Sequence, residues 1–132
     1  MRYFAKFKKE KEGGYSVSFP SLKGCFSEGD SFEEAKTMAT EALSLWLESA
    51  LEYNEVIPAP KEFTGKEYVA IEVPACIAVA IQLRKERGKR SIEEMAHIVQ
   101  NYEKFEQVSN PTLRSLEKVA NALGKRLEVN FA

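Results

Sequence analysis

The side chains that could carry out catalysis or hold a metal ion are few and widely separated along the chain. The sequence has one histidine, His97, one aspartate, Asp30, and two cysteines, Cys25 and Cys76. A Ser-His-Asp or Cys-His arrangement requires its members within hydrogen-bonding reach, and a zinc site requires several nitrogen or sulfur ligands. Because neither pattern is present, we predict a protein that acts by binding, with no enzymatic activity and no metal or other cofactor.

The same residues have structural interpretations. His97 is expected at the surface or boundary of a helix. No motif spacing pairs the cysteines, so both are expected to be small buried side chains in a reducing cytoplasm. Gly13-Gly14 lacks the pattern of a phosphate-binding loop and is typical of a hairpin turn.

The composition indicates a soluble globular protein whose two halves differ in charge. Of its 132 residues, 44% are hydrophobic and 30% are charged. No signal peptide and no apolar run of about eighteen residues is found, which favours a cytoplasmic protein without membrane insertion. Residues 1–72 carry 9 Lys and Arg against 13 Asp and Glu, and residues 73–132 carry 10 against 7. The resulting net charges of −4 and +3 predict different partners for the two halves.

Alternation of apolar and polar residues predicts a small sheet in the front half. Arg2–Lys9 and the segment Tyr15–Phe19 alternate on either side of the hairpin turn. A weaker third strand is expected around Gly24–Ser27, and a last strand at Tyr68–Val73. The order β-β-β-α-β indicates an α+β layer in which one long helix covers a small sheet.

That helix is predicted within Gly29–Pro60. Ser31 and Glu34 have the spacing of a capping box, in which Glu34 reaches back to the Ser31 amide. At 100° per residue, one stripe is apolar and is expected to face the sheet: Phe32, Ala35, Ala39, Ala42, Leu43, Trp46, Ala50 and Tyr53. The opposite face carries Glu34, Glu41, Glu48 and Glu52, with Met38 and Leu45 among them. This face is either a solvated acidic surface or a docking surface for a basic partner.

The back half is predicted to be a compact helical unit, with the domain boundary near Val73. Pro74 suits the first position of a helix over Ala75–Arg87, which Gly88 would end. A second capping box, Ser91–Glu94, predicts another helix with Ile92, Met95, Ala96 and Val99 facing inward. Asn110-Pro111 is expected to open a third helix, in which Leu113, Leu116, Val119, Ala120 and Leu123 share a face and which Gly124 stops. Leu127–Phe131 alternates like a terminal strand.

Nearly the whole chain resembles the HicB-type antitoxins of bacterial toxin–antitoxin pairs. The resemblance rests on the order and spacing of short segments: Met1–Tyr3 (MRY), Glu12–Pro20 (EGGYSVSFP), Glu28–Ala35 (EGDSFEEA), Asn54–Pro60 (NEVIPAP), Ile71–Pro74 (IEVP) and Ala122–Val129 (ALGKRLEV). It implies that residues 1–73 form a reduced RNase H-like domain that binds and blocks a small basic HicA-type mRNA-cleaving toxin. It also implies that residues 74–132 form an Xre-like helix-turn-helix domain, which binds the operon's own promoter as a dimer.

An RNase H activity would need carboxylates clustered on the sheet to hold divalent metal. The first strand carries none, since the first acidic residue is Glu10. The fold implied by the resemblance is therefore expected to be non-catalytic.

The segment Ala96–Phe105 departs from the Xre-type pattern, because it lacks a glycine and is about four residues short. Either a tight turn lies near Gln100-Asn101, or the second and third helices of the motif run together. Hydrophobic periodicity is compatible with both. A fused helix would weaken the expectation of a recognition helix that reads the major groove.

Three sets of residues are candidates for binding. Phosphate contacts are predicted for Arg84, Lys85, Arg87, Lys89 and Arg90, and base contacts for Asn101 and Lys104; the basic run could equally be a solvated helix end that complements the helix dipole. Toxin contacts are predicted for Glu34, Met38, Glu41, Leu45 and Glu48. Dimerisation is predicted through Leu127, Val129 and Phe131, since an unpaired strand edge invites pairing with its copy.

These residues lead to one principal functional prediction and two alternatives. The principal prediction is an antitoxin that occludes a partner ribonuclease and represses its own operon as a homodimer or higher oligomer. The first alternative is a plain transcriptional regulator whose front domain senses a ligand or dimerises. The second is a residual nuclease.

Overall fold

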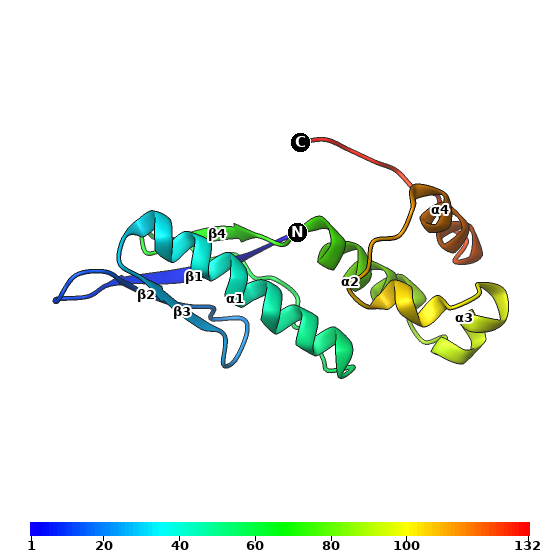
Figure 1. Ribbon diagram of the computed structural model, residues 1–132, viewed down its shortest axis with the longest axis horizontal. Helices are drawn as coiled ribbons and strands as arrows, with labels where there is room; N and C mark the ends of the chain where they lie inside the picture. Colours follow the sequence, from blue (N-terminus) through cyan, green and yellow to red (C-terminus); the bar gives the residue numbers. More distant parts are fainter.

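The computed structural model describes residues 1–132 and has a sheet layer at one end and a group of short helices at the other (Figure 1). Four strands form an antiparallel sheet in the order β3-β2-β1-β4. Their bounds are β1 (Arg2–Lys9), β2 (Tyr15–Ser18), β3 (Phe26–Gly29) and β4 (Tyr68–Glu72). The helical elements are α1 (Phe32–Glu52), α2 (Ala75–Arg87), α3 (Ile92–Ile98), the 3₁₀ helix η1 (Tyr102–Glu106) and α4 (Leu113–Ala122). The predicted α+β architecture is confirmed.

The predicted strands form, and β3 lies about two residues later than expected. Gly24 has a φ of +82° and belongs to a turn, in which the Phe19 amide donates to the Cys25 carbonyl at 3.1 Å. Strand pairing then begins at Ser18 and Phe26. The turn therefore uses the residues that the sequence pattern assigned to the start of the strand.

One face of the sheet and one side of α1 enclose the larger core. Tyr3, Ala5 and Phe7 are buried on β1, as the alternation predicts, and Ile71 is buried on β4. Ala39 and Leu43 of α1 are completely buried above them. Burying a large apolar side chain contributes roughly 1.5–3 kcal/mol, so this interface holds α1 on the sheet.

The buried line along α1 differs from the predicted stripe. Leu47 and Leu51 are buried, whereas Phe32 and Tyr53 are exposed. The buried residues Ala35, Ala39, Leu43, Leu47 and Leu51 follow four-residue steps. An i, i+4 ridge is inclined to the helix axis, so the contact line drifts away from the straight stripe and reaches different residues at both helix ends.

The start of α1 is capped almost as predicted. Ser31 Oγ accepts a hydrogen bond from the Glu34 amide at 3.1 Å. Glu34 Oε2 accepts from the amide of Asp30 at 3.0 Å, rather than from the Ser31 amide. The carboxylate therefore extends one residue farther back along the chain and ties the end of β3 to the helix.

A second, smaller core joins the short helices of the back half. It consists of Met95, Tyr102, Val119 and Leu123, with Leu83 of α2 packed against it. The first half of α2 belongs to the larger core, in which Ile77 and Ala80 are buried. One helix therefore packs against both groups of elements.

The turn between α3 and η1 resolves the two alternatives left open by the sequence. Asn101 has a φ of +58°, in the left-handed region. The Tyr102 amide donates to the Val99 carbonyl at 3.2 Å. The helices are not fused, because a left-handed residue ends the helical path. The next element along the chain is a five-residue 3₁₀ helix in place of a long third helix.

Three other expectations for the back half were wrong. The cap of α4 is Thr112, whose Oγ1 accepts from the Ser115 amide at 3.1 Å, so α4 begins after Asn110-Pro111. Ala96 is exposed, because α3 presents Met95 rather than Ala96 to the small core. Leu113 lies on the same helix face as the buried Leu116 but is exposed at the start of α4. Leu127–Phe131 forms no strand, since no strand lies beside it, and it extends away from α4 (Figure 1).

The two cysteines differ in environment. Cys25 is buried, as expected, and burial raises the pKa of its thiol to about 11, so it remains protonated and unreactive at neutral pH. Cys76 is exposed near the start of α2, contrary to the prediction, because that part of α2 directs Ile77 rather than Cys76 into the core. No helix combines the length and apolar character needed to cross a membrane.

Candidate functional site

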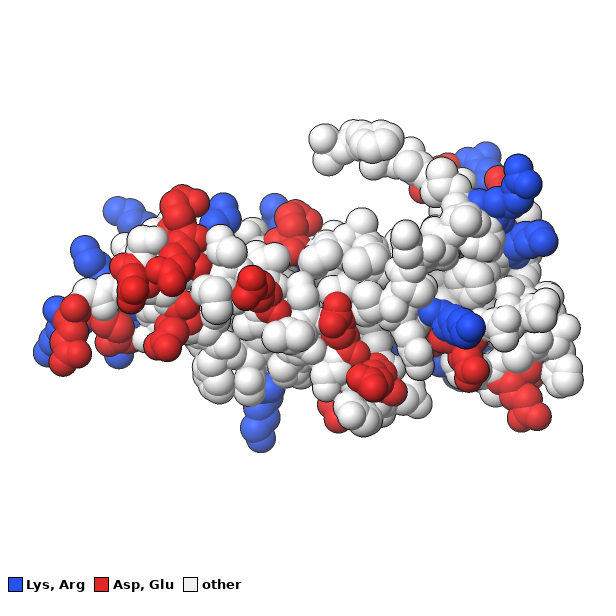
Figure 2. Space-filling model, in the orientation of Figure 1, with Lys and Arg blue, Asp and Glu red and all other residues white.

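The outer face of α1 displays both carboxylates and apolar side chains. Glu34 and Glu41 are exposed, and Glu48 is half-buried. Met38 is 38% exposed and Leu45 is 67% exposed. The structure therefore brings all five predicted toxin-contacting residues onto one accessible helix face. Figure 2 shows acidic residues gathered over this half of the molecule.

The acidic surface extends beyond α1 onto the sheet. An open cleft of about 330 Å³ lies beside the start of the helix. Its lining includes Glu10, Glu28, Asp30, Glu34 and Met38. Glu10 also accepts a hydrogen bond from the Ser16 hydroxyl. The cleft places three further carboxylates next to the predicted face of α1.

Sequence reasoning missed Glu10, Glu28 and Asp30 as members of this surface. They come from the start of the β1–β2 turn, from β3 and from the loop before α1. The pairing of Ser16 with Glu28 brings β3 beside the hairpin, and that register has no signal in the local spacing of the carboxylates.

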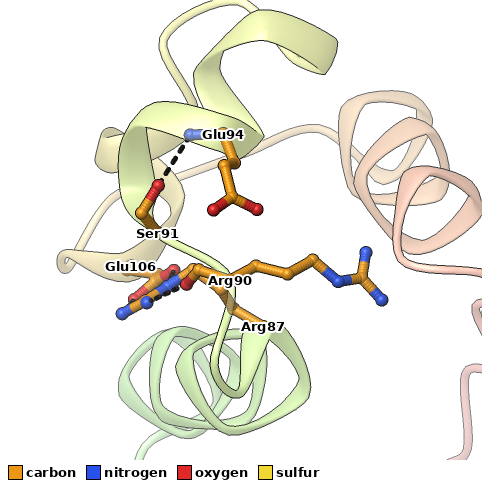
Figure 3. A network of polar contacts seen from close by, with 5 residues as sticks. All are labelled: Arg87, Arg90, Ser91, Glu94 and Glu106. Carbon is orange, nitrogen blue, oxygen red and sulfur yellow. Dashed lines mark hydrogen bonds and ion pairs between the residues drawn. The ribbon is translucent and has the colours of Figure 1, made fainter.

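Arg87, which was predicted to contact phosphate, is held by an ion pair inside the back half. Arg87 Nε lies 2.6 Å from Glu106 Oε2, and Nη2 lies 3.1 Å from Oε1. Nη1 donates to the Arg90 carbonyl at 2.6 Å. The side chains of Arg87 and Glu106 are only 14% and 7% exposed. Figure 3 shows this arrangement, in which α2 is joined to η1 and to the start of α3.

The surroundings of this ion pair favour the charged form of Arg87. The hydrogen bond with Glu106 raises the pKa of the Arg87 guanidinium above its ordinary value. Burial raises the pKa of the neighbouring Tyr102 hydroxyl, so this side chain is neutral. The network therefore has a structural role, and its cation is not available to an external phosphate.

Of the other predicted phosphate contacts, one is half-buried and bonded within the protein, and three are exposed. Arg84 Nη2 donates to the Glu55 carbonyl at 2.5 Å, which ties α2 to the loop after α1. Lys85, Lys89 and Arg90 are exposed. Arg90 Nη1 lies 3.5 Å from the carbonyl of Ala122 at the end of α4. Of the five residues predicted to contact phosphate, these three are therefore accessible to anions from solution.

The predicted base-reading residues lie on a short segment. Asn101 and Lys104 are exposed, with Glu103 exposed between them. The η1 helix buries Tyr102 and Glu106. At about 2.0 Å per residue, its five residues span roughly 10 Å. Asn101 and Lys104 therefore stand at its start and middle, with the exposed Glu103 beside them.

The chain end provides an apolar surface. Val129 is 58% exposed and Phe131 is 97% exposed. A groove of about 350 Å³ lies between α2, α4 and the chain end, and its lining includes Val79, Leu83, Leu116, Leu123 and Leu127. The residues predicted for dimerisation are thus accessible, and Leu127 lies at the groove.

The residues with metal-binding side chains do not converge. No group of three or more His, Cys, Asp or Glu side chains lies in an arrangement that could hold a metal ion. His97 is exposed on α3. The accessible features of this chain include an acidic surface, a basic end and an apolar tail.

Comparisons with known proteins give consistent similarities. The family described as the HicB-like antitoxin of the bacterial toxin–antitoxin system matches residues 3–90. Antitoxin HicB 1 of Photorhabdus laumondii is 31% identical over 99% of this chain and 87% of its own length. Antitoxin HicB of Escherichia coli K12 is 29% identical over 98% of both chains. A crystal structure of the Burkholderia pseudomallei antitoxin HicB has a TM-score of 0.50 at 17% identity, covering 58% of this chain and 66% of that one, a likeness of fold.

Proposed function

Because the chain belongs to the HicB-like antitoxins of bacterial toxin–antitoxin systems, we propose that it binds and occludes a small basic HicA-type toxin and represses its own operon. In this proposal the front half, residues 1–73, captures the toxin in the cytoplasm. The back half, residues 74–132, binds promoter DNA as a dimer. The protein catalyses no reaction of its own; it prevents the toxin's RNA-binding surface from reaching RNA.

The observation that carries the toxin-binding proposal is the outer face of α1. This face exposes Met38 between Glu34 and Glu41, and Leu45 between Glu41 and Glu48. Protein interfaces combine an apolar centre with charged groups that orient the partner. The adjoining cleft with Glu10, Glu28 and Asp30 enlarges the negative surface and favours a positively charged partner.

Reversing two charges on this face is expected to weaken toxin capture. The double variant Glu41→Lys and Glu48→Lys should lower toxin affinity about tenfold or more at low salt, because like charges then meet across the interface. The loss should shrink as salt screens the charges. Affinity of the full chain for its HicA-type toxin can be measured by isothermal titration calorimetry at two salt concentrations.

The matched control changes charge by the same amount elsewhere. Glu62 and Glu67 are exposed in the loop between α1 and β4, and their replacement by Lys should leave capture nearly unchanged. Equal losses in both double variants would indicate a general effect of net charge. Unchanged binding in the Glu41 and Glu48 variant would remove the α1 face from the proposal.

Dimerisation is expected to depend on the chain end. Val129 and Phe131 are exposed, and an exposed alternating segment with free backbone groups can pair with its copy. Deletion of residues 127–132 should convert dimers to monomers in multi-angle light scattering. Replacement of Val129 and Phe131 by Ser should also shift dimers toward monomers, without shortening the chain. Dimers that persist in both variants would place the interface elsewhere.

A further inference from the structure

The exposed side of α4 is a basic face with an amide side chain. Leu116, Val119, Ala120 and Leu123 are turned into the protein. At 100° per residue, Arg114, Lys118 and Asn121 lie within about 60° of one another on the opposite side, and all three are exposed. Figure 2 shows Lys and Arg side chains gathered at this end of the molecule.

We propose that α4 is the element of the back half that lies against duplex DNA, with Arg114 and Lys118 on phosphates and Asn121 on a base edge. This inference rests on the proposed promoter binding and assigns it to a different helix from the one that the sequence predicted. It makes Arg90 a flanking phosphate contact, and it gives η1 a supporting role inside the domain.

The charges on α4 are not explained by contacts within the protein. The ion pairs of the structure involve Glu72, Glu86, Glu106 and Glu128 as acids, and none includes Arg114 or Lys118. Arg114 and Lys118 are four residues apart, a spacing at which like charges destabilise a helix. Only Glu117 beside them offsets the repulsion. A local cost of this kind is characteristic of a binding surface.

The geometry of α4 suits a DNA groove better than η1 does. The ten residues of α4 make a helix about 15 Å long, and the major groove, roughly 12 Å wide, admits an α-helix. Along the helix axis, Lys118 lies about 6 Å and Asn121 about 10 Å from Arg114. An Asn side chain can make paired hydrogen bonds with adenine. By contrast, η1 has five residues and buries two of them.

The loop between α2 and α3 adds cations beside this face. Arg90 Nη1 lies 3.5 Å from the Ala122 carbonyl, and Figure 3 shows the Arg90 side chain extending toward α4. Lys89 is the exposed residue next to it. The ion pair between Arg87 and Glu106, together with the bond from Arg87 to the Arg90 carbonyl, holds this loop in position. The basic surface is therefore built from two separated segments of the chain.

The experiment measures binding of the full chain to two labelled duplexes, its own promoter and a shuffled sequence, at several salt concentrations by fluorescence anisotropy. The double variant Arg114→Ala and Lys118→Ala should bind both duplexes more weakly and reduce the slope of log affinity against log salt by about two. Asn121→Ala should instead reduce the preference for the promoter by roughly 5- to 150-fold. Circular dichroism should show unchanged folding, because all three side chains are exposed.

Two comparison variants make the result decisive. Lys61→Ala with Lys66→Ala removes the same charge from the exposed loop before β4 and should leave the salt slope unchanged. Asn101→Ala with Lys104→Ala tests the segment predicted from sequence. An unaltered slope in the α4 double variant, or loss of promoter preference only in the Asn101 and Lys104 variant, would overturn the inference and leave promoter binding intact. A wild-type chain that prefers neither duplex, with or without toxin, would remove promoter repression itself and this inference with it.

Discussion

Replacement of Glu106 by Ala is expected to lower the free energy of unfolding by about 3–5 kcal/mol. The Glu106 carboxylate is nearly inaccessible and makes two contacts with Arg87, at 2.6 and 3.1 Å. Removing one partner of a buried ion pair leaves a charge without compensation, and the observed cost of this is about 3–5 kcal/mol. Chemical denaturation followed by circular dichroism would measure the change.

Two controls separate the buried charge from the loss of side-chain volume. Replacing both partners, Arg87→Met with Glu106→Leu, should restore much of the stability, because a well-packed apolar pair is often equivalent to a buried ion pair. Glu128→Ala removes a surface ion pair, in which Arg126 Nη2 lies 2.5 Å from Glu128 Oε1 and the two side chains are 84% and 67% exposed. This substitution should change the free energy of unfolding by less than about 1 kcal/mol. A small effect of Glu106→Ala, equal to that of Glu128→Ala, would contradict the structural role of the network.

Replacement of Gly29 by Ala is expected to destabilise the protein by about 3 kcal/mol or more. A Cβ at position 29 would lie 2.3 Å from the Ala35 amide nitrogen and 2.6 Å from Ala35 Cα. Overpacking costs about 1–3 kcal/mol and sometimes more, and here the colliding atoms are backbone atoms of α1, which cannot move as a side chain can. Thermal and urea unfolding of the variant would measure the loss.

Gly24→Ala provides the matched control for this prediction. Gly24 has a φ of +82° and nothing within 4 Å of an added Cβ, so the substitution costs only the left-handed backbone conformation, about 1–2 kcal/mol. Gly29 has no positive φ, so its penalty comes from contact with α1. If Gly29→Ala were no more destabilising than Gly24→Ala, the result would contradict the close packing of β3 against the start of α1.

Both structural predictions bear on the proposed binding surfaces. Gly29 and Asp30 line the acidic cleft beside α1, so the close approach of β3 and α1 determines where its carboxylates lie. The ion pair of Arg87 and Glu106 holds the loop that carries Lys89 and Arg90. A variant that loses either contact is therefore expected to lose binding at the corresponding surface in addition to stability.

Local pattern alone placed most of the elements, and it brought one predicted set of contact residues onto a single helix face. Alternation placed β1 and its buried residues Tyr3, Ala5 and Phe7, because the side chains of a strand have a period of two. The spacing of Glu41, Leu45 and Glu48 placed them on one helix face, because residues three, four and seven apart lie on the same side of an α-helix. Ser31 and Ser91 were correctly identified as helix caps.

Features that depend on contacts between distant segments required the tertiary structure. The pattern of charges could not distinguish Arg87 and Arg84, which are engaged by Glu106 and by the Glu55 carbonyl, from the exposed Lys85 and Lys89. A sequence run records charge but not burial, and a charged side chain is buried only when a partner from another element reaches it. The partner of Arg87 lies 19 residues away.

The same reason accounts for the two surfaces that local spacing did not reveal. Glu10, Glu28 and Asp30 meet only through the register of β2 with β3 and the packing of α1. The periodicity of α4 was visible in the sequence, but the base contacts had been assigned to Asn101 and Lys104. The helix that carries Lys104, η1, is seen to be short only once Asn101 is placed in the left-handed conformation. Sequence periodicity determined which residues share an element, and three-dimensional packing decided which elements face solvent together, because burial depends on neighbours that are far away in the chain.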